Sequence, residues 1–215
     1  MNLAALFGSA FVIGLSGAMM PGPVLTATVS EALKRGVVAG PLIVAGHAVL
    51  EFALLLFVIA GLGPWIERDA VQGVLGVLGG ATLIVMGADM IRSARAAVEK
   101  ALAPAAGGAR PASVRRPLLM GIVLSLSNPY WAVWWATIGL NLASRALQRG
   151  APGLAAFYSG HISSDLVWYT AVSMAVASGR RICPPAAYRA LIAACGAALI
   201  GLGAMFLGDG AGRWT

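Results

Sequence analysis

GHAVLE, residues 46–51, lies inside a long apolar segment and places a histidine and an acid four residues apart. Almost the same string, GHISSD, occupies residues 160–165, at an offset of 114 residues. A second match shares that offset, because ALKRG at 32–36 reappears as ALQRG at 146–150. Two matches in one register indicate that the chain contains an internal repeat.

The composition is that of a membrane protein. Hydrophobic residues make up 59% of the 215 residues and charged residues 11%. Apolar runs longer than ~18 residues recur along the chain, which is typical of membrane-spanning helices. We therefore expect an all-α polytopic membrane protein, in which each helix crosses ~30 Å of hydrocarbon. The six predicted transmembrane helices cover residues 4–29, 38–63, 70–90, 118–142, 153–177 and 188–208.

The net charge of +7 does not indicate nucleic-acid binding, because the basic residues lie in short loops between the predicted spans and not in patches with aromatic residues. Eleven of the fifteen Lys and Arg residues fall on one side of the predicted membrane. The other four are Arg68, Arg145, Arg149 and Arg213. Because cytoplasmic loops collect Lys and Arg, we expect both termini to lie outside the cytoplasm.

The repeat divides the chain into a first unit over residues 1–91 and a second unit over residues 118–215. Between them, residues 92–117 contain APAAGG and are predicted to form a cytoplasmic linker. Each unit has three spans, and an odd number of spans inverts the second unit relative to the first. The expected fold is therefore two inverted three-helix repeats, an arrangement that places a substrate site between the units near the membrane midplane.

Prolines interrupt the first and fourth predicted helices. Pro21, Gly22 and Pro23 form a PGP string, in which the missing N–H groups free backbone carbonyls that lipid cannot satisfy. Asn128 and Pro129 have the pattern of an N-cap and first residue of a new half-helix. The N–H groups at the start of a half-helix suit a carboxylate ligand. A plain proline kink remains the alternative for each break.

The repeated strings form the candidate site. His47 with Glu51, and His161 with Asp165, each share one helical face. An acid at a transmembrane helix centre costs roughly 2.5–3.5 kcal/mol, so such residues usually line a cavity or carry function. The sequence puts no Lys or Arg in the span centres with them, so a proton, a histidine or a bound cation must neutralise them. The pattern favours a proton relay or an ammonium site. A clasp that fixes helix register and a Zn or Mn site are alternatives.

Aromatic residues accompany both parts of this candidate site. Trp168 and Tyr169 follow the second acid by one helical turn and are candidates to line a substrate cavity, including cation–π contact with an ammonium group. Trp131, Trp134 and Trp135 follow the break in the fourth helix. For this cluster, packing or an interfacial belt is an equally good interpretation.

Glycines mark one face of the third predicted helix. Gly73, Gly80 and Gly87 recur every seven residues, a spacing that lets two helices approach closely. The partner is either another helix of the same chain or a second copy in a homodimer.

Taken together, these motifs resemble the LysE/RhtB-type amino-acid exporters. The resemblance rests on PGP in the first span, a basic-Gly turn before the second, SNP with tryptophans in the fourth and GHxxxDLxWY in the fifth. It covers nearly the whole chain. Val24 follows PGP where many relatives have Asn, and the second span keeps an intact GHxxxE, unlike the better-known lysine and threonine exporters.

The resemblance implies an inner-membrane transporter that is not an enzyme and uses no cofactor. It would export amino acids or similar small metabolites, driven by the proton gradient. Its partners would be the small-molecule substrate, protons and the lipid bilayer. A divalent-cation exporter that uses the two histidines and two carboxylates is the alternative function.

Overall fold

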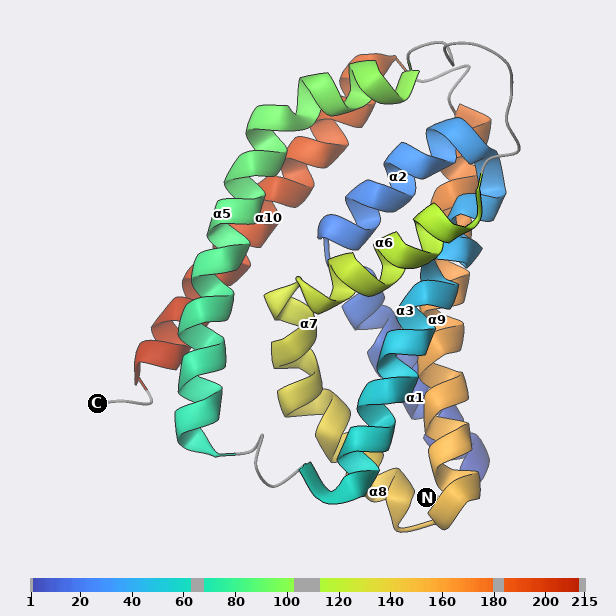
Figure 1. Cartoon of the computed structure of the whole chain (residues 1–215), viewed down its shortest axis with the longest axis vertical. Coiled ribbons are helices and arrows are strands. Elements are labelled where there is room, and N and C mark those ends of the chain that lie inside the picture. Colours follow the sequence, from blue (N-terminus) through green and yellow to red (C-terminus); the bar gives the residue numbers. More distant parts are fainter. Residues whose placement is uncertain (1, 63–67, 103–112, 180–183, 213–215) are drawn as a thin grey trace.

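The chain folds into helices throughout the part that the structure, a computed structural model, describes, which is residues 2–62, 68–102, 113–179 and 184–212 (Figure 1). The helices are α1 (Leu3–Ala18), α2 (Pro23–Arg35), α3 (Ala39–Phe57), α5 (Asp69–Leu102), α6 (Arg115–Leu126), α7 (Pro129–Trp134), α8 (Leu140–Leu147), α9 (Gly150–Gly179) and α10 (Pro185–Gly212). Three short helical turns, Gly36–Val38, Val58–Leu62 and Trp135–Gly139, join neighbouring helices. No strand occurs in these residues.

The helix breaks lie at the two proline strings. α1 ends at Ala18 and α2 begins at Pro23, so PGP separates two helices within the predicted first span. Likewise α6 ends at Leu126 and α7 begins at Pro129. Asn128 is the N-cap of α7, and its side chain accepts a hydrogen bond from the backbone N–H of Tyr130 at 3.2 Å. This is the capping role that the Asn-Pro pair predicted.

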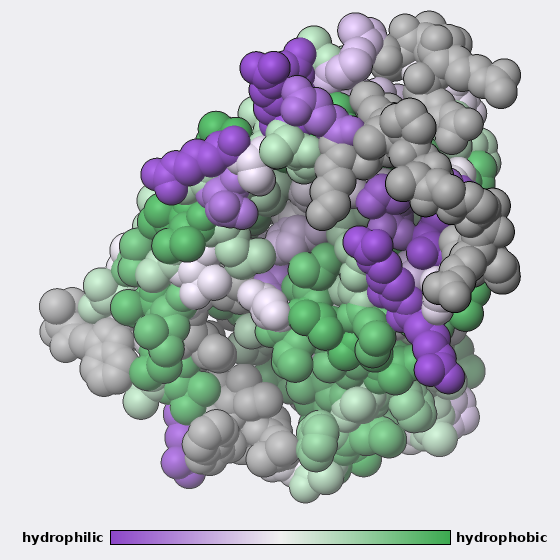
Figure 2. Space-filling view, turned by 45° about the horizontal axis from the view of Figure 1, so that its top comes forward, coloured by the Kyte–Doolittle hydropathy of each residue, from purple (hydrophilic) through white to green (hydrophobic). Residues whose placement is uncertain are grey.

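The apolar surface supports a membrane location. Pro23–Gly61, Asp69–Glu99 and Pro185–Gly212 are each helical, long and apolar enough to cross a bilayer. The first of these reverses at Gly36, where φ is 73°, and therefore contains two helices. Large apolar side chains point outward; Val85, for example, is 68% exposed. Figure 2 shows apolar residues over much of one face, with hydrophilic residues gathered toward one end. Soluble proteins rarely expose apolar patches of this kind.

α5 is longer than predicted. The third span was expected to end at residue 90, with a linker from residue 92, but the helix continues to Leu102. The residues beyond the span favour a helix, and Arg95 donates to Glu99 one turn further on at 2.8 Å. Polar residues can therefore extend a membrane helix into water, and hydropathy alone does not mark its end. Residues 103–112 of the predicted linker lie outside the described residues.

The heptad glycines of α5 pack against α10, which lies beside it in Figure 1. A Cβ on Gly87 would overlap the carbonyl oxygen of Gly196, and a Cβ on Gly80 would press on the backbone of Gly203. Gly73 continues this contact toward the end of α10. The glycine face is therefore occupied within the chain, and not by a second copy.

Close helix crossings also surround the candidate site. α3 crosses α6 where a Cβ on Gly46 would overlap the carbonyl of Leu118. α1 crosses α9 where a Cβ on Gly160 would overlap the carbonyl of Phe7. Gly46 and Gly160 are the first residues of the two repeated strings. The glycine in each string therefore brings a neighbouring helix against the histidine and acid that follow it.

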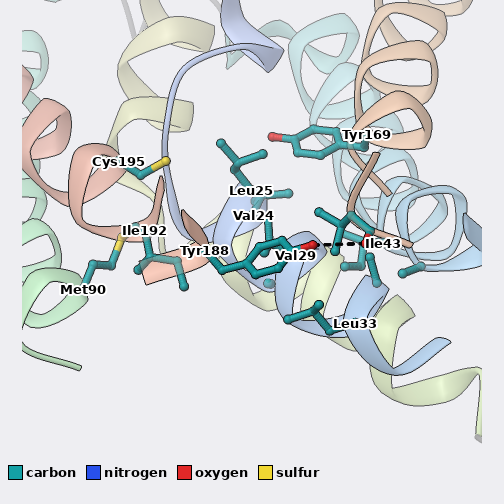
Figure 3. Packing of buried hydrophobic residues seen from close by; sticks show 14 of the residues in the cluster. Val24, Leu25, Val29, Leu33, Ile43, Met90, Tyr169, Tyr188, Ile192 and Cys195 are labelled. Carbon is teal, nitrogen blue, oxygen red and sulfur yellow. Dashed lines mark hydrogen bonds between the residues drawn. The ribbon is translucent and has the colours of Figure 1, made fainter. Parts of the chain in front are cut away.

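A buried apolar cluster joins α2 to its neighbours. Figure 3 shows Val24 and Val29 of α2 between Ile192 of α10 on one side and Ile43 of α3 on the other. In the same view, the hydroxyl of Tyr188 on α10 points toward α9. This packing holds α2, which begins at the PGP break, between the α5–α10 pair and the rest of the helices.

A buried acid lies at the basic end of the molecule. Glu31 of α2 is 1% exposed, and its carboxylate is 2.6 Å from Nε of Arg35, 3.7 Å from Nζ of Lys34 and 3.8 Å from a guanidinium nitrogen of Arg116. Arg35 also donates to the carbonyl of Ser113 at 3.2 Å. These contacts tie α2 to the beginning of α6 at the end that the charge distribution assigns to the cytoplasm.

Candidate functional site

The two repeated strings meet in the middle of the molecule. His47 and Glu51 come from α3, and His161 and Asp165 come from α9. One nitrogen or oxygen atom from each of the four side chains lies within 4.8 Å of the others. All four side chains are buried; the two acids are 1% and 4% exposed. The structure thus brings together the four residues that the repeat singled out, from positions 114 residues apart.

Glu51 is surrounded by donors. Its Oε1 accepts hydrogen bonds from the indole N–H groups of Trp131 at 3.0 Å and Trp135 at 2.8 Å. The same oxygen lies 3.0 Å from Nε2 of His47, and Oε2 lies 3.0 Å from Nε2 of His161. Four nitrogen atoms therefore face one buried carboxylate, which is the environment that stabilises its charge.

The two histidines are held in different ways. Nδ1 of His47 lies 2.7 Å from the hydroxyl of Ser125 on α6, which leaves Nε2 directed at the acids. The ring of His161 stacks on Trp134, with centroids 4.7 Å apart and an interplanar angle of 20°. Phe157 lies on the same ring at 6.2 Å. A hydrogen bond orients one imidazole, and aromatic packing orients the other.

Asp165 is less well satisfied than Glu51. Its Oδ2 is 3.6 Å from Nε2 of His47 and 3.9 Å from Nε2 of His161, distances beyond a good hydrogen bond. Among the residues that the structure describes, this buried oxygen has no hydrogen-bond partner. A buried acceptor without a donor is costly, so Asp165 is poised to accept from a ligand or to take up a proton.

A cavity of about 60 Å³ opens beside this cluster. Since one water molecule needs roughly 10–15 Å³ on this measure, there is room for a few waters or a small solute. The four clustered side chains line it, together with Pro21, Gly22, Asn128 and Tyr169 from the predicted site, and with Gly17, Ala18, Met20, Val24, Ser125, Tyr130, Trp131, Trp134 and Leu199.

Both helix breaks face the cavity. Gly22 is the N-cap of α2 and has no side-chain oxygen to accept from the N–H groups of Val24 and Leu25. A Cβ on Gly22 would lie 3.7 Å from Nδ2 of Asn128. The Oδ1 of Asn128 already accepts from the backbone, which leaves its amide N–H groups for another acceptor. Hydrogen-bond donors from both breaks therefore face the cavity, whereas the buried acids offer it hydrogen-bond acceptors.

A larger hollow continues away from the basic end. It has a volume of about 330 Å³ and shares Met20, Tyr130 and Trp134 with the cavity. It extends along α10 to Phe206 and Asp209. Tyr130 stacks on Phe206 with centroids 6.2 Å apart and rings nearly parallel. The small cavity and the wider hollow are therefore neighbouring spaces that share part of their lining.

Not every predicted site residue lines the cavity. Trp168 packs with the buried apolar cluster around α2, because its position on α9 faces that cluster. Pro23 is buried as the first residue of α2. Pro129 begins α7, and the placement of its side chain is not described. The prediction for Trp168 as a cavity residue is therefore not supported, while Tyr169 does line the cavity.

Sequence reasoning missed one contributor to the site and left two others undecided. Ser125 orients one histidine, yet a serine in an apolar helix carries no pattern that would have identified it. Trp131 and Trp135 donate to Glu51, although packing had been an equally good interpretation for them. The four-residue spacing of these two tryptophans could have identified them as a pair, because it places both indoles on one face of the helix after the break.

Comparison with known proteins identifies relatives along nearly the whole chain. The sequence model of the family described as LysE type translocator matches residues 15–210. "Chemotactic transduction protein ChpE" of Pseudomonas aeruginosa is 26% identical over 208 residues, which cover 95% of this chain and 98% of that protein. "Putative amino acid efflux protein YcgF" of Bacillus subtilis is 25% identical over 202 residues, which cover 94% of each. No solved structure matches the chain.

Proposed function

This chain belongs to the LysE type translocator family, and we propose that it exports amino acids or related small metabolites across the inner membrane in exchange for protons. The family match agrees with the resemblance seen in the motifs and makes the chain a membrane transporter. The similarity to a protein named for amino acid efflux supports the substrate class.

One observation carries the proposal. A single cavity combines two buried acids, each with one oxygen that has no hydrogen-bond partner among the described residues, with backbone and amide donors from two helix breaks. An α-amino acid is a zwitterion, and it fits such a site with its ammonium group on the acids and its carboxylate at the start of α2 and on Asn128. The aromatic side chains around the cavity exclude water and strengthen both interactions.

The proton and the ammonium group would compete for the acids. In this mechanism Glu51 and Asp165 bind a proton and the substrate ammonium alternately, and His47 and His161 relay or tune the proton. When a proton arrives, the charge that holds the ammonium group is lost and the substrate leaves. Exchange then follows because both cargoes need the same buried charges.

Alternating access would come from the repeat. We propose that the two units are inverted relative to each other and that one rocks against the other around the central cavity. The contacts of Glu31 with Arg116 close the basic end, which we assign to the cytoplasm, while the hollow along α10 leads toward the other end. The structure would then correspond to a state that is closed on the cytoplasmic side.

Efflux from proteoliposomes under an imposed pH gradient tests the proposal. We expect the gradient to drive amino-acid efflux by the wild-type chain, and Glu51→Gln or Asp165→Asn to abolish the coupling. Glu99→Gln is the matched control, because Glu99 is a surface acid whose side chain is 62% exposed. Proton-dependent transport that survives in both site variants would contradict the mechanism.

A divalent-cation exporter remains a second candidate, because the four clustered side chains offer two imidazoles and two carboxylates within 4.8 Å. In that case Zn²⁺ or Mn²⁺ would raise the melting temperature of the detergent-solubilised protein, while amino acids would not. A melting temperature that rises with amino acids, and not with Zn²⁺ or Mn²⁺, favours the amino-acid exporter.

A further inference from the structure

The walls of the cavity restrict what its cargo can be. Apart from the four clustered side chains, the described residues that line it contribute apolar surfaces, hydroxyls, indole N–H groups and one amide, and no Lys or Arg is among them. Any charged group of the cargo must therefore be matched by the cluster, by Asn128 or by the start of α2.

One bound zwitterion would pair with nearly all the groups of the cavity that can bind a charge. Both oxygens of Glu51 already face nitrogen atoms of tryptophan and histidine side chains. The imidazole nitrogens are 3.6 and 3.9 Å from Oδ2 of Asp165, so this oxygen is the acceptor left for an α-ammonium group, and the donors at α2 and Asn128 serve the α-carboxylate. Beyond these two acids the described cavity lining offers no carboxylate for a second ammonium group, and it offers no Lys or Arg for a second carboxylate. Burying either one unpaired is strongly unfavourable.

Space sets a second restriction. At roughly 10–15 Å³ per water molecule, a cavity of about 60 Å³ holds the equivalent of roughly four to six waters. The walls cannot easily retreat, because Leu199 and Ala18 are 1% and 5% exposed and are packed in the apolar clusters. Elsewhere in the lining, a Cβ on Gly17 would already lie 3.1 Å from the indole nitrogen of Trp134.

We propose that the cargo is an α-amino acid with a short, uncharged side chain, of the size of glycine, alanine or serine. The inference rests on the proposed function and narrows it. Asp165 holds the ammonium group, the α2 start and Asn128 hold the carboxylate, and the side chain lies against Leu199. Basic, acidic and bulky aromatic amino acids are excluded, the first two by charge and the third by volume.

A counterflow panel in proteoliposomes tests this specificity. Purified full-length protein would be loaded with alanine and offered labelled glycine, alanine, serine, leucine, phenylalanine, lysine and glutamate. We expect exchange of the first three amino acids at rates at least roughly tenfold above the last three, the discrimination that pocket size can supply.

A variant of Leu199 tests whether this cavity residue limits the size of the substrate side chain. Leu199→Ala enlarges the space and should raise the leucine-to-alanine flux ratio roughly tenfold. Leu83→Ala is the matched control, because Leu83 is 0% exposed and lies on α5 outside the cavity lining. It should leave the ratio unchanged in protein of verified folding.

The outcomes distinguish the proposed restriction to small uncharged side chains from the proposed amino-acid export itself. Exchange of lysine, glutamate or phenylalanine as fast as alanine would overturn the restriction to small uncharged side chains and leave amino-acid export standing. An unchanged flux ratio in Leu199→Ala would remove Leu199 as the specificity wall. A panel without exchange of any amino acid, in liposomes with correctly inserted protein, would overturn the proposed function and the restriction together.

Discussion

GHAVLE and GHISSD have the same spacing of glycine, histidine and acid, yet the two acids have different surroundings. Glu51 accepts two indole hydrogen bonds and has an imidazole nitrogen 3.0 Å from each of its oxygens, whereas the imidazole nitrogens nearest to Oδ2 of Asp165 lie 3.6 and 3.9 Å away. The difference arises because Trp131 and Trp135 follow the second helix break and no tryptophan follows the first. A repeated sequence string has thus produced an asymmetric site, in which one acid accepts two indole hydrogen bonds and the other accepts none from the described residues.

A second pair of positions related by the repeat offset also has different surroundings. Glu31 in the first unit is buried among three basic side chains, while the position 114 residues later is Arg145, which is exposed on α8. The two corresponding positions therefore differ, because the first is a buried acid among basic side chains and the second is an exposed base. If the chain exports its substrate as proposed, its two sides must behave differently, and these differences within the repeat are one way to achieve this.

The largest effect should separate the two acids by stability. Glu51→Gln should lower the free energy of unfolding by about 3–5 kcal/mol, because it leaves several buried donors facing a poorer acceptor. Asp165→Asn should change it by no more than about 1 kcal/mol, since no good hydrogen bond is lost. Unfolding in detergent, without amino acids, measures both. Equal losses would show that the acids are interchangeable and would remove the asymmetry.

The indole donors are predicted to cause much of this difference. Trp135→Phe keeps the ring packing but removes the N–H that donates to Glu51 at 2.8 Å. We expect a loss of roughly 1.5–3 kcal/mol, the usual contribution of a hydrogen bond to a charged group. The matched control is Trp168→Phe, because this indole packs with the apolar cluster and is not within the site. A loss no larger than that of the control would mean that packing alone explains Trp135.

The glycines of the two strings should behave alike, in contrast to the acids. Gly46→Ala and Gly160→Ala each place a Cβ against a backbone carbonyl of a crossing helix. Overpacking of this kind costs about 1–3 kcal/mol, and we expect similar losses in both variants by thermal unfolding. Gly208→Ala is the control, since a Cβ there has nothing within 4 Å. Strongly unequal losses at Gly46 and Gly160 would show that the repeat is not preserved even in its helix packing.

Much of this arrangement could be predicted from sequence because local signals determine it. PGP and Asn-Pro end and begin helices through their own backbone chemistry, and the shared offset paired α3 with α9 before any contact was known. The remaining features depend on how each helix is rotated against distant partners. Trp135 faces the site and Trp168 faces the apolar cluster, although both are tryptophans in apolar helices. No local pattern distinguishes them.

The smallest predicted effect concerns the histidine of the first string. Ser125→Ala removes the hydroxyl that lies 2.7 Å from Nδ1 of His47 and holds its Nε2 toward both acids. We expect a loss of about 0.5–1.5 kcal/mol in stability and a larger relative loss in proton-coupled efflux, because the imidazole can then adopt the other tautomer or turn away. Ser125→Thr keeps a hydroxyl and should restore the coupling if the wider side chain fits.

Ser164→Ala is the control for the other histidine. Nδ1 of His161 has no hydroxyl partner among the described residues, and the hydroxyl of Ser164 donates to a backbone carbonyl of its own helix. Removing this hydroxyl should therefore leave the coupling intact. If both serine variants reduced coupling equally, the two histidines would be equivalent, and the asymmetry would be limited to the acids.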